Sequence, residues 1–382
     1  MARTPAKEMR PRGPFVNLLT TGTLIALSVV AAYLIRLATV KSGVAEDIEK
    51  ITQTRRFLDR DIALRSDYTG NALVDQGIGT LIAAFMGGPA GWDLGFQVQM
   101  AYFLVSFFSV ISIWTVESVR KRNENAWISY TSVWALFYQT VGGAIIIPLY
   151  YIAYFNKSVP STYWNTSGRP VPLGYAKALL PALVIGYLVP TIALFLPDSD
   201  PEQKLRQFLV FLWQPCPLYV NGLLSLLSRI FSSSSDNPRA VEKKGTTTTI
   251  QDVNYLNSLY LVAFAVTAAA HFATFYIILT STDPQHSFTH VFVKPYDWGQ
   301  SGVTKGLHAV FQADYWIIFL ASLLWAYLAI FDLKRGRKTN ISLVTAAGLL
   351  VIGSIVVGPA AVLAAVWYWR ENVMVKPDLY TG

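Results

Sequence analysis

The chain has 382 residues, of which 53% are hydrophobic and only 14% are charged, whereas an ordinary soluble domain carries roughly 25% charged residues. This composition argues against a soluble globular fold. The net charge of +8 does not indicate nucleic-acid binding, because most basic residues stand in short clusters beside apolar stretches, where membrane orientation requires them. The single cysteine, Cys216, excludes an internal disulfide and a cysteine-based metal site.

Seven apolar stretches are long enough to cross a bilayer, which takes about 20 residues of helix. In chain order they cover residues 15–35, 94–116, 127–155, 172–196, 255–280, 315–331 and 343–369. Two further stretches are weaker, because 77–92 is short and glycine-rich and 205–231 is interrupted at Gln214-Pro215. The alternation of period 2 that is typical of membrane β-barrels is absent. Residues 1–382 are therefore predicted to form one all-α membrane domain, a polytopic transmembrane helical bundle with seven spans, or eight if 205–231 crosses.

Basic residues prefer the cytoplasmic side of a membrane and so set the orientation of these spans. With seven spans, all four basic clusters lie on that side. The clusters surround Arg12, Arg120, Lys243 and Lys334. The N-terminus is then cytoplasmic and the C-terminus lumenal. The glycosylation acceptors Asn156-Lys-Ser and Asn165-Thr-Ser fall on the lumenal side, so the sequence predicts a multi-pass glycoprotein of the endoplasmic reticulum membrane.

Three connecting segments have a distinct character. Residues 37–76 carry apolar side chains at helical spacing between charges of both signs, which predicts a lumenal amphipathic helix on the membrane surface or over the bundle. These apolar positions are Val44, Ile48, Ile51, Leu58 and Ile62. Residues 232–254 are polar and low in complexity, and are predicted to form a cytoplasmic loop. Residues 281–313 are predicted to form a lumenal loop that acts as a lid.

Ionisable residues within membrane spans are costly, so each is a candidate functional residue. In the seven-span arrangement, four candidates gather in the lumenal half: Asp93, His271, Asp314 and Glu371. Each also has a structural interpretation. Asp93 and Asp314 stand where a helix cap is expected. His271 suits a hydrogen-bonded packing residue, and Glu371 suits an interfacial pair with its neighbour Arg370.

Aromatic and amide side chains stand beside these four residues. Five of them are predicted to bind substrate: Trp92, Gln97, Tyr315, Trp316 and Trp367. Some of these rings are also expected from the aromatic belt at a membrane surface. A carboxylic acid in an apolar, aromatic pocket stays protonated and can act as an acid, and aromatic faces can stabilise a cation. Isoprenoid cyclisation requires this combination, because it protonates an alkene or epoxide and then shields the carbocation from water.

Other catalytic motifs are absent. The sequence has no DDxxD diphosphate-binding pair, no NDxxDxxxD pattern of the UbiA-type prenyltransferases, and no GxSxG, P-loop or GxGxxG. His286 and His290 have the i,i+4 spacing of helical metal ligands, and His308 follows. Pro284 and Pro295 flank that stretch, which argues against a continuous helix. We therefore expect neither a metal site nor a cofactor.

Two C-terminal stretches resemble a known family. One is Phe311-Gln-Ala-Asp314-Tyr315-Trp, followed by Leu323-Leu-Trp325-Ala; the other is Gly358-Pro359-Ala-Ala, leading to Trp367-Tyr-Trp-Arg370-Glu371. With the overall size and span layout, they are similar to the integral membrane terpene cyclases of fungal meroterpenoid gene clusters, of the macrophorin and ascochlorin type. The resemblance covers the C-terminal third best. It implies a metal-independent enzyme that protonates an epoxide or terminal olefin of a prenylated precursor, and Asp314 and Glu371 fall on the matching stretches.

The predicted function is thus a membrane-embedded terpene cyclase that binds a lipid-soluble prenylated substrate between its helices, surrounded by membrane lipid. Asp314, Glu371 or Asp93 would be the general acid, and His271 or a second carboxylate would remove the final proton. Two other functions stay open. A small-metabolite transporter would move a substrate without changing its structure. A non-catalytic seven-span receptor or scaffold would tolerate loss of the membrane acids.

Overall fold

The computed structural model describes residues 11–164, 168–196, 199–232, 251–293 and 302–375. Their regular structure is helical, apart from one isolated bridge between Arg56 and Ala63. Among the described residues, five helices are long and apolar enough to cross a membrane. They are Pro14–Lys41 (α1, η1 and α2), α5 (Leu94–Ser118), Leu173–Ala193 (α8, η6 and α9), α13 (Gln251–Thr280) and α15 (Gly302–Arg335). The all-α class is confirmed, whereas the count of seven spans is not.

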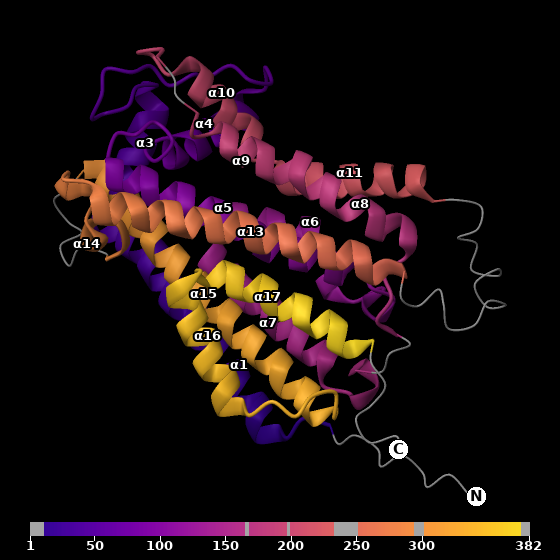
Figure 1. The fold of residues 1–382 in the computed structure, drawn as a ribbon. Helices are drawn as coiled ribbons and strands as arrows, with labels where there is room; N and C mark the ends of the chain where they lie inside the picture. Colours follow the sequence, from indigo (N-terminus) through magenta and orange to yellow (C-terminus); the bar gives the residue numbers. More distant parts are fainter. Residues whose placement is uncertain (1–10, 165–167, 197–198, 233–250, 294–301, 376–382) are drawn as a thin grey trace, which may run out of the picture.

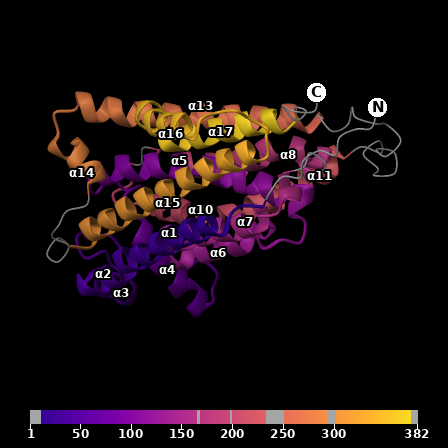
Figure 2. The same ribbon diagram turned by 90° about the horizontal axis from the view of Figure 1, so that it is seen from below.

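The long helices run side by side in both views (Figures 1 and 2). We name the two ends of the bundle after residues at the ends of α5, the Asp93 end and the Glu117 end. They lie about 37 Å apart, the length of a 25-residue helix at about 1.5 Å per residue. α1 begins at the Glu117 end, where Arg12 pairs with Asp332 near the end of α15. The short helices α3 (Val44–Thr54) and α14 (Phe288–Phe292) lie at the Asp93 end.

The predicted span 127–155 is instead a hairpin of two short helices, α6 (Thr131–Val141) and α7 (Gly143–Ser158). The chain reverses at Gly142, whose φ of +122° is strained for any residue with a side chain. Both outer ends lie at the Glu117 end, where Ser158 accepts a hydrogen bond from Arg12 at 3.0 Å. Asn156 therefore shares an end with Arg12 and not with Asp93, so its predicted lumenal position is inconsistent with a cytoplasmic Arg12. Asn165 lies outside the described residues.

The predicted span 343–369 is a second hairpin, formed by α16 (Leu343–Val356) and α17 (Pro359–Met374). Gly358, with φ +91°, makes the turn, and Pro359 begins the second helix, a position that suits proline. The two arms pack closely, since a Cβ on Gly353 would lie 2.7 Å from Val362. α17 thereby returns to the Glu117 end, as the two yellow helices of Figure 1 show. Glu371 therefore shares an end with Arg120 and Arg12, so its predicted lumenal position is inconsistent with a cytoplasmic position of those arginines.

The stretch 205–231 traverses the bundle as a bent pair, α10 (Lys204–Trp213) and α11 (Cys216–Phe231), with an angle of 56° between them. α10 begins beside Arg65, whose N–H donates to Gln207, and α11 ends where a Cβ on Gly174 would meet Ser232. With this pair, the described residues contain up to six segments that are long and apolar enough to cross a membrane. Six crossings still gather Arg12, Arg120 and Arg335 at one end, so the charge rule alone did not distinguish six spans from seven.

The connecting segments differ from the prediction in their boundaries. Within 37–76, α3 ends at Thr54 because Arg55 adopts a left-handed conformation, and α4 (Ala72–Phe85) follows under the Asn71 cap. Residues 233–250 of the predicted polar loop lie outside the described residues. In the predicted lid 281–313, described residues form η9 (Pro284–His286) and α14, and then α15 begins at Gly302. Asp314 consequently lies well inside a helix and is not a helix cap.

Candidate functional site

A cavity of about 260 Å³ lies in the half of the bundle toward the Asp93 end. It is bordered by η1, α3, α4, α5, α15 and the turn of the α6–α7 hairpin. Of the nine residues predicted for the site, only Asp314 lines it. The exposed residues Arg36, Thr80 and Thr140 also line it, so the cavity reaches the surface there. Its volume is below the roughly 300–1,000 Å³ that encloses a whole drug-sized ligand.

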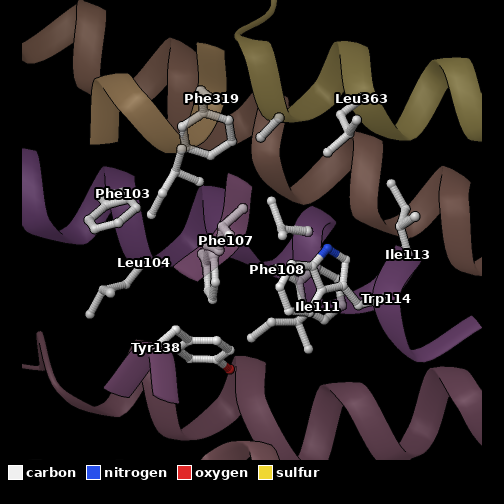
Figure 3. Close-up of a cluster of buried hydrophobic side chains, with 14 of the residues drawn as sticks. Phe103, Leu104, Phe107, Phe108, Ile111, Ile113, Trp114, Tyr138, Phe319 and Leu363 are labelled. Atoms are coloured by element: carbon white, nitrogen blue, oxygen red, sulfur yellow. The ribbon is translucent and has the colours of Figure 1, made fainter. Parts of the chain in front are cut away.

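The inner wall of the cavity is aromatic. Phe103 and Phe107 are four residues apart on α5 and project from one face, as helical periodicity requires. Phe107 meets Tyr138 of α6 edge to face, with ring centroids 5.5 Å apart (Figure 3). Tyr187 packs against Phe107 at 6.4 Å and against Trp213 at 6.4 Å. This wall offers ring faces to a bound ligand and no carboxylate.

The polar rim is built where the α6–α7 hairpin breaks. Asp314 Oδ1 accepts a hydrogen bond from the N–H of Ala144 at 2.6 Å, at the N-terminus of α7, where helix N–H groups lack partners within the helix. Arg36 donates from Nε to the carbonyl of Val141 at 2.9 Å and from Nη2 to that of Thr140, at the C-terminus of α6. An acid and a cation thus satisfy the two broken helix ends on either side of Gly142, and both face the cavity.

Two π-helical turns also border the cavity. η1 (Tyr33–Leu37) contributes Ile35 and Arg36, and η6 (Val184–Leu188) contributes Tyr187. A π-helical turn inserts a residue into a helix and redirects its side chains, and such turns are frequent at functional sites. Their presence on two walls supports this cavity as the candidate site.

Asp93 lies outside the cavity, at the start of α5, where its side chain caps Phe96. His290 Nε2 donates to both carboxylate oxygens of Asp93 at 2.9 Å, and His308 Nδ1 lies 3.9 Å from Oδ1. Burial alone would raise the pKa of Asp93. The Phe96 N–H and His290 outweigh burial and hold the pKa of Asp93 below its usual value.

His271 is hydrogen-bonded through both ring nitrogens. Nε2 donates to the carbonyl of Ile355 at 3.1 Å, so Nδ1 accepts from the hydroxyl of Tyr102 at 2.9 Å. The ring lies against the turn at Gly358 and does not line the cavity. His271 therefore fastens the α16–α17 hairpin to α13 and α5.

Glu371 belongs to a buried network of ion pairs at the Glu117 end. It pairs with Arg120 and Arg169, and all three side chains have no exposed surface. The other members of the network are Glu117, Asp252 and Arg370. Trp367 donates from Nε1 to Glu117 at 3.3 Å, and its ring packs at a tilt against Trp325 with centroids 4.1 Å apart. Neither Glu371 nor Trp367 is near the cavity, so the prediction that the four ionisable candidates gather in one place is wrong.

The other predicted substrate residues lie around the Asp93 end, outside the cavity lining. Trp92 packs edge-on against Phe57, with centroids 4.8 Å apart. Tyr315 donates to Tyr102, and Trp316 donates to the carbonyl of Phe292. Gln97 reaches the carbonyl of Pro89 at 3.5 Å.

The cavity residues that the sequence analysis missed carried weak signals. Phe311 and Ile318 stand three residues before and four residues after the predicted Asp314, which places them on the same face of α15. Phe103 and Phe107 repeat that spacing on α5. The doublet Gly142-Gly143 within an apolar run signalled a break, and a break exposes main-chain groups that an acid or a cation can satisfy.

The sequence is similar to those of several fungal proteins. The CtvD domain family matches residues 20–375. The chain is 25% identical to the terpene cyclase ascI of Acremonium egyptiacum over 82% of both chains, and 28% identical to the terpene cyclase resF of Aspergillus sclerotiorum over 72% of both. It is also 27% identical to the FAD-dependent monooxygenase verC1 of Penicillium polonicum, over 69% of this chain but only 31% of that protein. No solved structure matches.

Proposed function

The chain belongs to the CtvD domain family, and from this we propose that it is a membrane-embedded terpene cyclase whose general acid is Asp314. The matches to ascI and resF confirm the resemblance to fungal terpene cyclases. The match to verC1 covers only 31% of that longer protein, so we do not carry its monooxygenase activity over to this chain. The observation that carries the acid assignment is one carboxyl group on the rim of an aromatic cavity.

The environment of Asp314 suits an acid. Among the described residues its carboxyl accepts only the Ala144 N–H, which leaves Oδ2 for a substrate. Apolar surroundings favour the neutral, proton-bearing form of a carboxyl group. After the proton has left, Arg36 on the same rim balances the charge of the carboxylate.

The reaction would be an isomerisation without a co-reactant. Asp314 gives its proton to the epoxide oxygen, or to the terminal carbon of an olefin, and the breaking C–O bond or the opened π bond leaves a carbocation. Further alkenes of the prenyl chain attack, and new C–C bonds form while Phe107, Tyr138 and Tyr187 face the cation. Loss of a C–H proton ends the reaction. Asp314 is the one carboxylate among the described residues that line the cavity, and taking up that proton would restore it to the acid.

The size of the cavity suits the reacting end of a lipid-soluble prenylated precursor. The rest of the precursor would extend out of the cavity through its opening at Arg36 and Thr140. We further propose that the chain is a multi-pass protein of the endoplasmic reticulum membrane, with lipid around its exposed apolar helices. The five helices that are long and apolar enough to span a membrane, and the basic residues gathered at one end, support a multi-pass arrangement. Nucleic acid has no part in this function, and the acid step requires no metal.

The test is to express the full chain in microsomes, supply a prenylated epoxide, and follow products by mass spectrometry. General acid catalysis contributes about 10²–10⁴-fold to a rate, so Asp314→Asn should lower turnover by that factor. Its amide oxygen can still accept the Ala144 N–H, so the fold should persist. Asp61→Asn is the matched control, because Asp61 is exposed and pairs only with Arg56 at the surface. Full turnover by Asp314→Asn, or loss of turnover on chelation in protein that stays folded, would contradict the proposal.

The alternative of a transporter makes an opposite prediction. Proteoliposomes containing the wild-type chain would accumulate the supplied compound with its mass spectrum and retention time unchanged. A cyclase instead yields a product of equal mass and altered retention time. A non-catalytic membrane protein would give neither result.

A further inference from the structure

We propose that Asp93, His290 and His308 form a binding site for a divalent transition metal, of which Zn²⁺ is the type. The three residues come from the start of α5, from α14 and from α15, and no local spacing in the sequence brings them together. Their ligand atoms all lie within 4.8 Å of one another. This assignment does not depend on the proposed cyclase function, and it departs from the expectation that the chain has no metal site.

The donor set fits zinc better than calcium or magnesium. Two imidazoles and one carboxylate are the ligands of many zinc sites with an open fourth position, whereas calcium and magnesium prefer oxygen alone. Ligand atoms around one tetrahedral zinc ion lie about 3.3 Å apart, given metal–ligand distances of about 2.0–2.1 Å. The distances here bracket that value, at 2.9 Å from Asp93 to His290 and 3.9 Å from Asp93 to His308. A small inward movement of the His308 ring would complete the site.

The surrounding residues hold the ligands in place, as outer partners do in metal sites. The Phe96 N–H donates to Asp93 Oδ1 at 2.8 Å, and the Phe96 ring stacks on His308 with centroids 5.0 Å apart. Gln312 donates to the carbonyl of His290 at 2.8 Å and lies 3.2 Å from His308 Nε2. Gln312 contacts the Nε2 atom of His308, on the side of the ring away from Asp93, so the Nδ1 atom of His308 is directed at the metal site.

Gly95 shows how closely His290 approaches α5. A Cβ at this position would lie 2.2 Å from His290 Cδ2 and 2.5 Å from the carbonyl oxygen of Gln285. Any side chain there would displace His290 from Asp93. The glycine therefore permits the site, and its replacement is a second means of removing it.

The site is separate from the cavity. His308 and Gln312 stand on one face of α15, while Phe311, Asp314 and Ile318 stand on the face that lines the cavity. The side chain of His290 is 33% exposed, against 9% for Asp93 and 6% for His308, so an ion can enter beside His290. A bound ion would fasten the segment 284–292 across the beginnings of α5 and α15. Its role would be structural.

The experiment measures zinc directly. The full chain is purified in detergent, equilibrated with a slight excess of Zn²⁺, freed of unbound ion and analysed by inductively coupled plasma mass spectrometry. We expect about one zinc ion per chain for the wild type, and a loss of about tenfold or more in His290→Ala and Gly95→Ala. Chelation should lower the melting temperature of the wild type and leave that of His290→Ala unchanged.

His286→Ala is the matched control. His286 lies in the same segment, but its Nδ1 contacts Ser281 at 2.7 Å and it is not part of the site, so this variant should keep its zinc. Asp314→Asn should also keep its zinc while losing turnover, which separates failure of this inference from failure of the cyclase proposal. Equal zinc in the wild type and His290→Ala, or less than about a tenth of an equivalent in the wild type, would overturn the inference.

Discussion

Replacing Glu371 with glutamine should destabilise the whole bundle without acting on the chemistry directly. The carboxylate pairs with Arg120 and Arg169, and none of the three side chains is exposed. The variant would leave two guanidinium groups buried without their shared partner. Removing one partner of a buried ion pair costs about 3–5 kcal/mol. A folded domain is stable by only about 5–15 kcal/mol in total, so the loss is a large fraction of it.

The assay follows unfolding of the purified full chain in detergent by tryptophan fluorescence as temperature rises, together with turnover per folded molecule. Glu124→Gln is the matched control, because Glu124 lies on the exposed loop next to the network and surface substitutions usually change stability by less than about 0.5 kcal/mol. The double variant Arg169→Gln, Glu371→Gln should lose less than the sum of the two single variants, since both remove the same pair.

One result would refute this reasoning. If Glu371→Gln melted at the wild-type temperature but no longer formed product, the carboxylate would be acting in the reaction. That is the role that the sequence analysis assigned to it, and the placement of Glu371 far from the cavity would then need another explanation.

Three further predictions concern the cavity and its surroundings. Gly142→Ala should lower the free energy of unfolding by about 1–3 kcal/mol, because alanine is strained at φ +122°. Gly348→Ala is the control and should not destabilise the chain, because Gly348 lies in a helix with open space around it. Chemical unfolding of the two variants measures the difference. Phe107→Ala should enlarge the cavity and admit water, so the amount of water-quenched product should rise relative to cyclised product in the chromatogram. An unchanged product ratio would be evidence against this aromatic wall as the path of the cation. The Thr69 hydroxyl, helped by the N–H groups of Thr69 and Gly70, holds the pKa of Asp75 below its usual 3.8 despite partial burial. The ionised Asp75 carboxyl group therefore contributes its full stabilisation above pH 3.8, and this stabilisation is lost as the pH falls through the lower pKa of the folded state. Asp75→Asn should remove this pH dependence, which hydrogen exchange of the Gly70 amide, corrected for its intrinsic rate, would report.

The helical class could be predicted from composition, and Asp314 could be selected as a candidate because a carboxyl group is costly in an apolar span; the structure places it on the cavity. The hairpins could not be predicted from hydropathy, since an apolar run scores the same whether it crosses or turns back. The sequence did indicate the two breaks through residues that favour turns. Gly142-Gly143 and Gly358-Pro359 are turn-forming pairs, and the second was noted as a motif but not as a break.

Errors in placing residues followed from those breaks. Treating 343–369 as one crossing moved Glu371 to the wrong end and separated it from Arg120. Polar residues such as Lys305 and His308 concealed the first turns of α15, so Asp314 was expected at a helix cap. The group of Asp93, His290 and His308 is a tertiary arrangement spread over more than 200 residues, and no periodicity within one helix reports it.

The α6–α7 hairpin extends only partway through the bundle, and the cavity lies beyond the turn at its tip. The depth of the cavity is therefore set by the length of two helices as well as by the side chains on its walls. Removing one helical turn from each arm would withdraw the tip by about 5.4 Å while keeping the same faces toward their neighbours. Insertion or deletion of whole turns in α6 and α7 would therefore change the length of ligand that the cavity accepts, with Asp314 of α15 and the aromatic wall of α5 left unchanged.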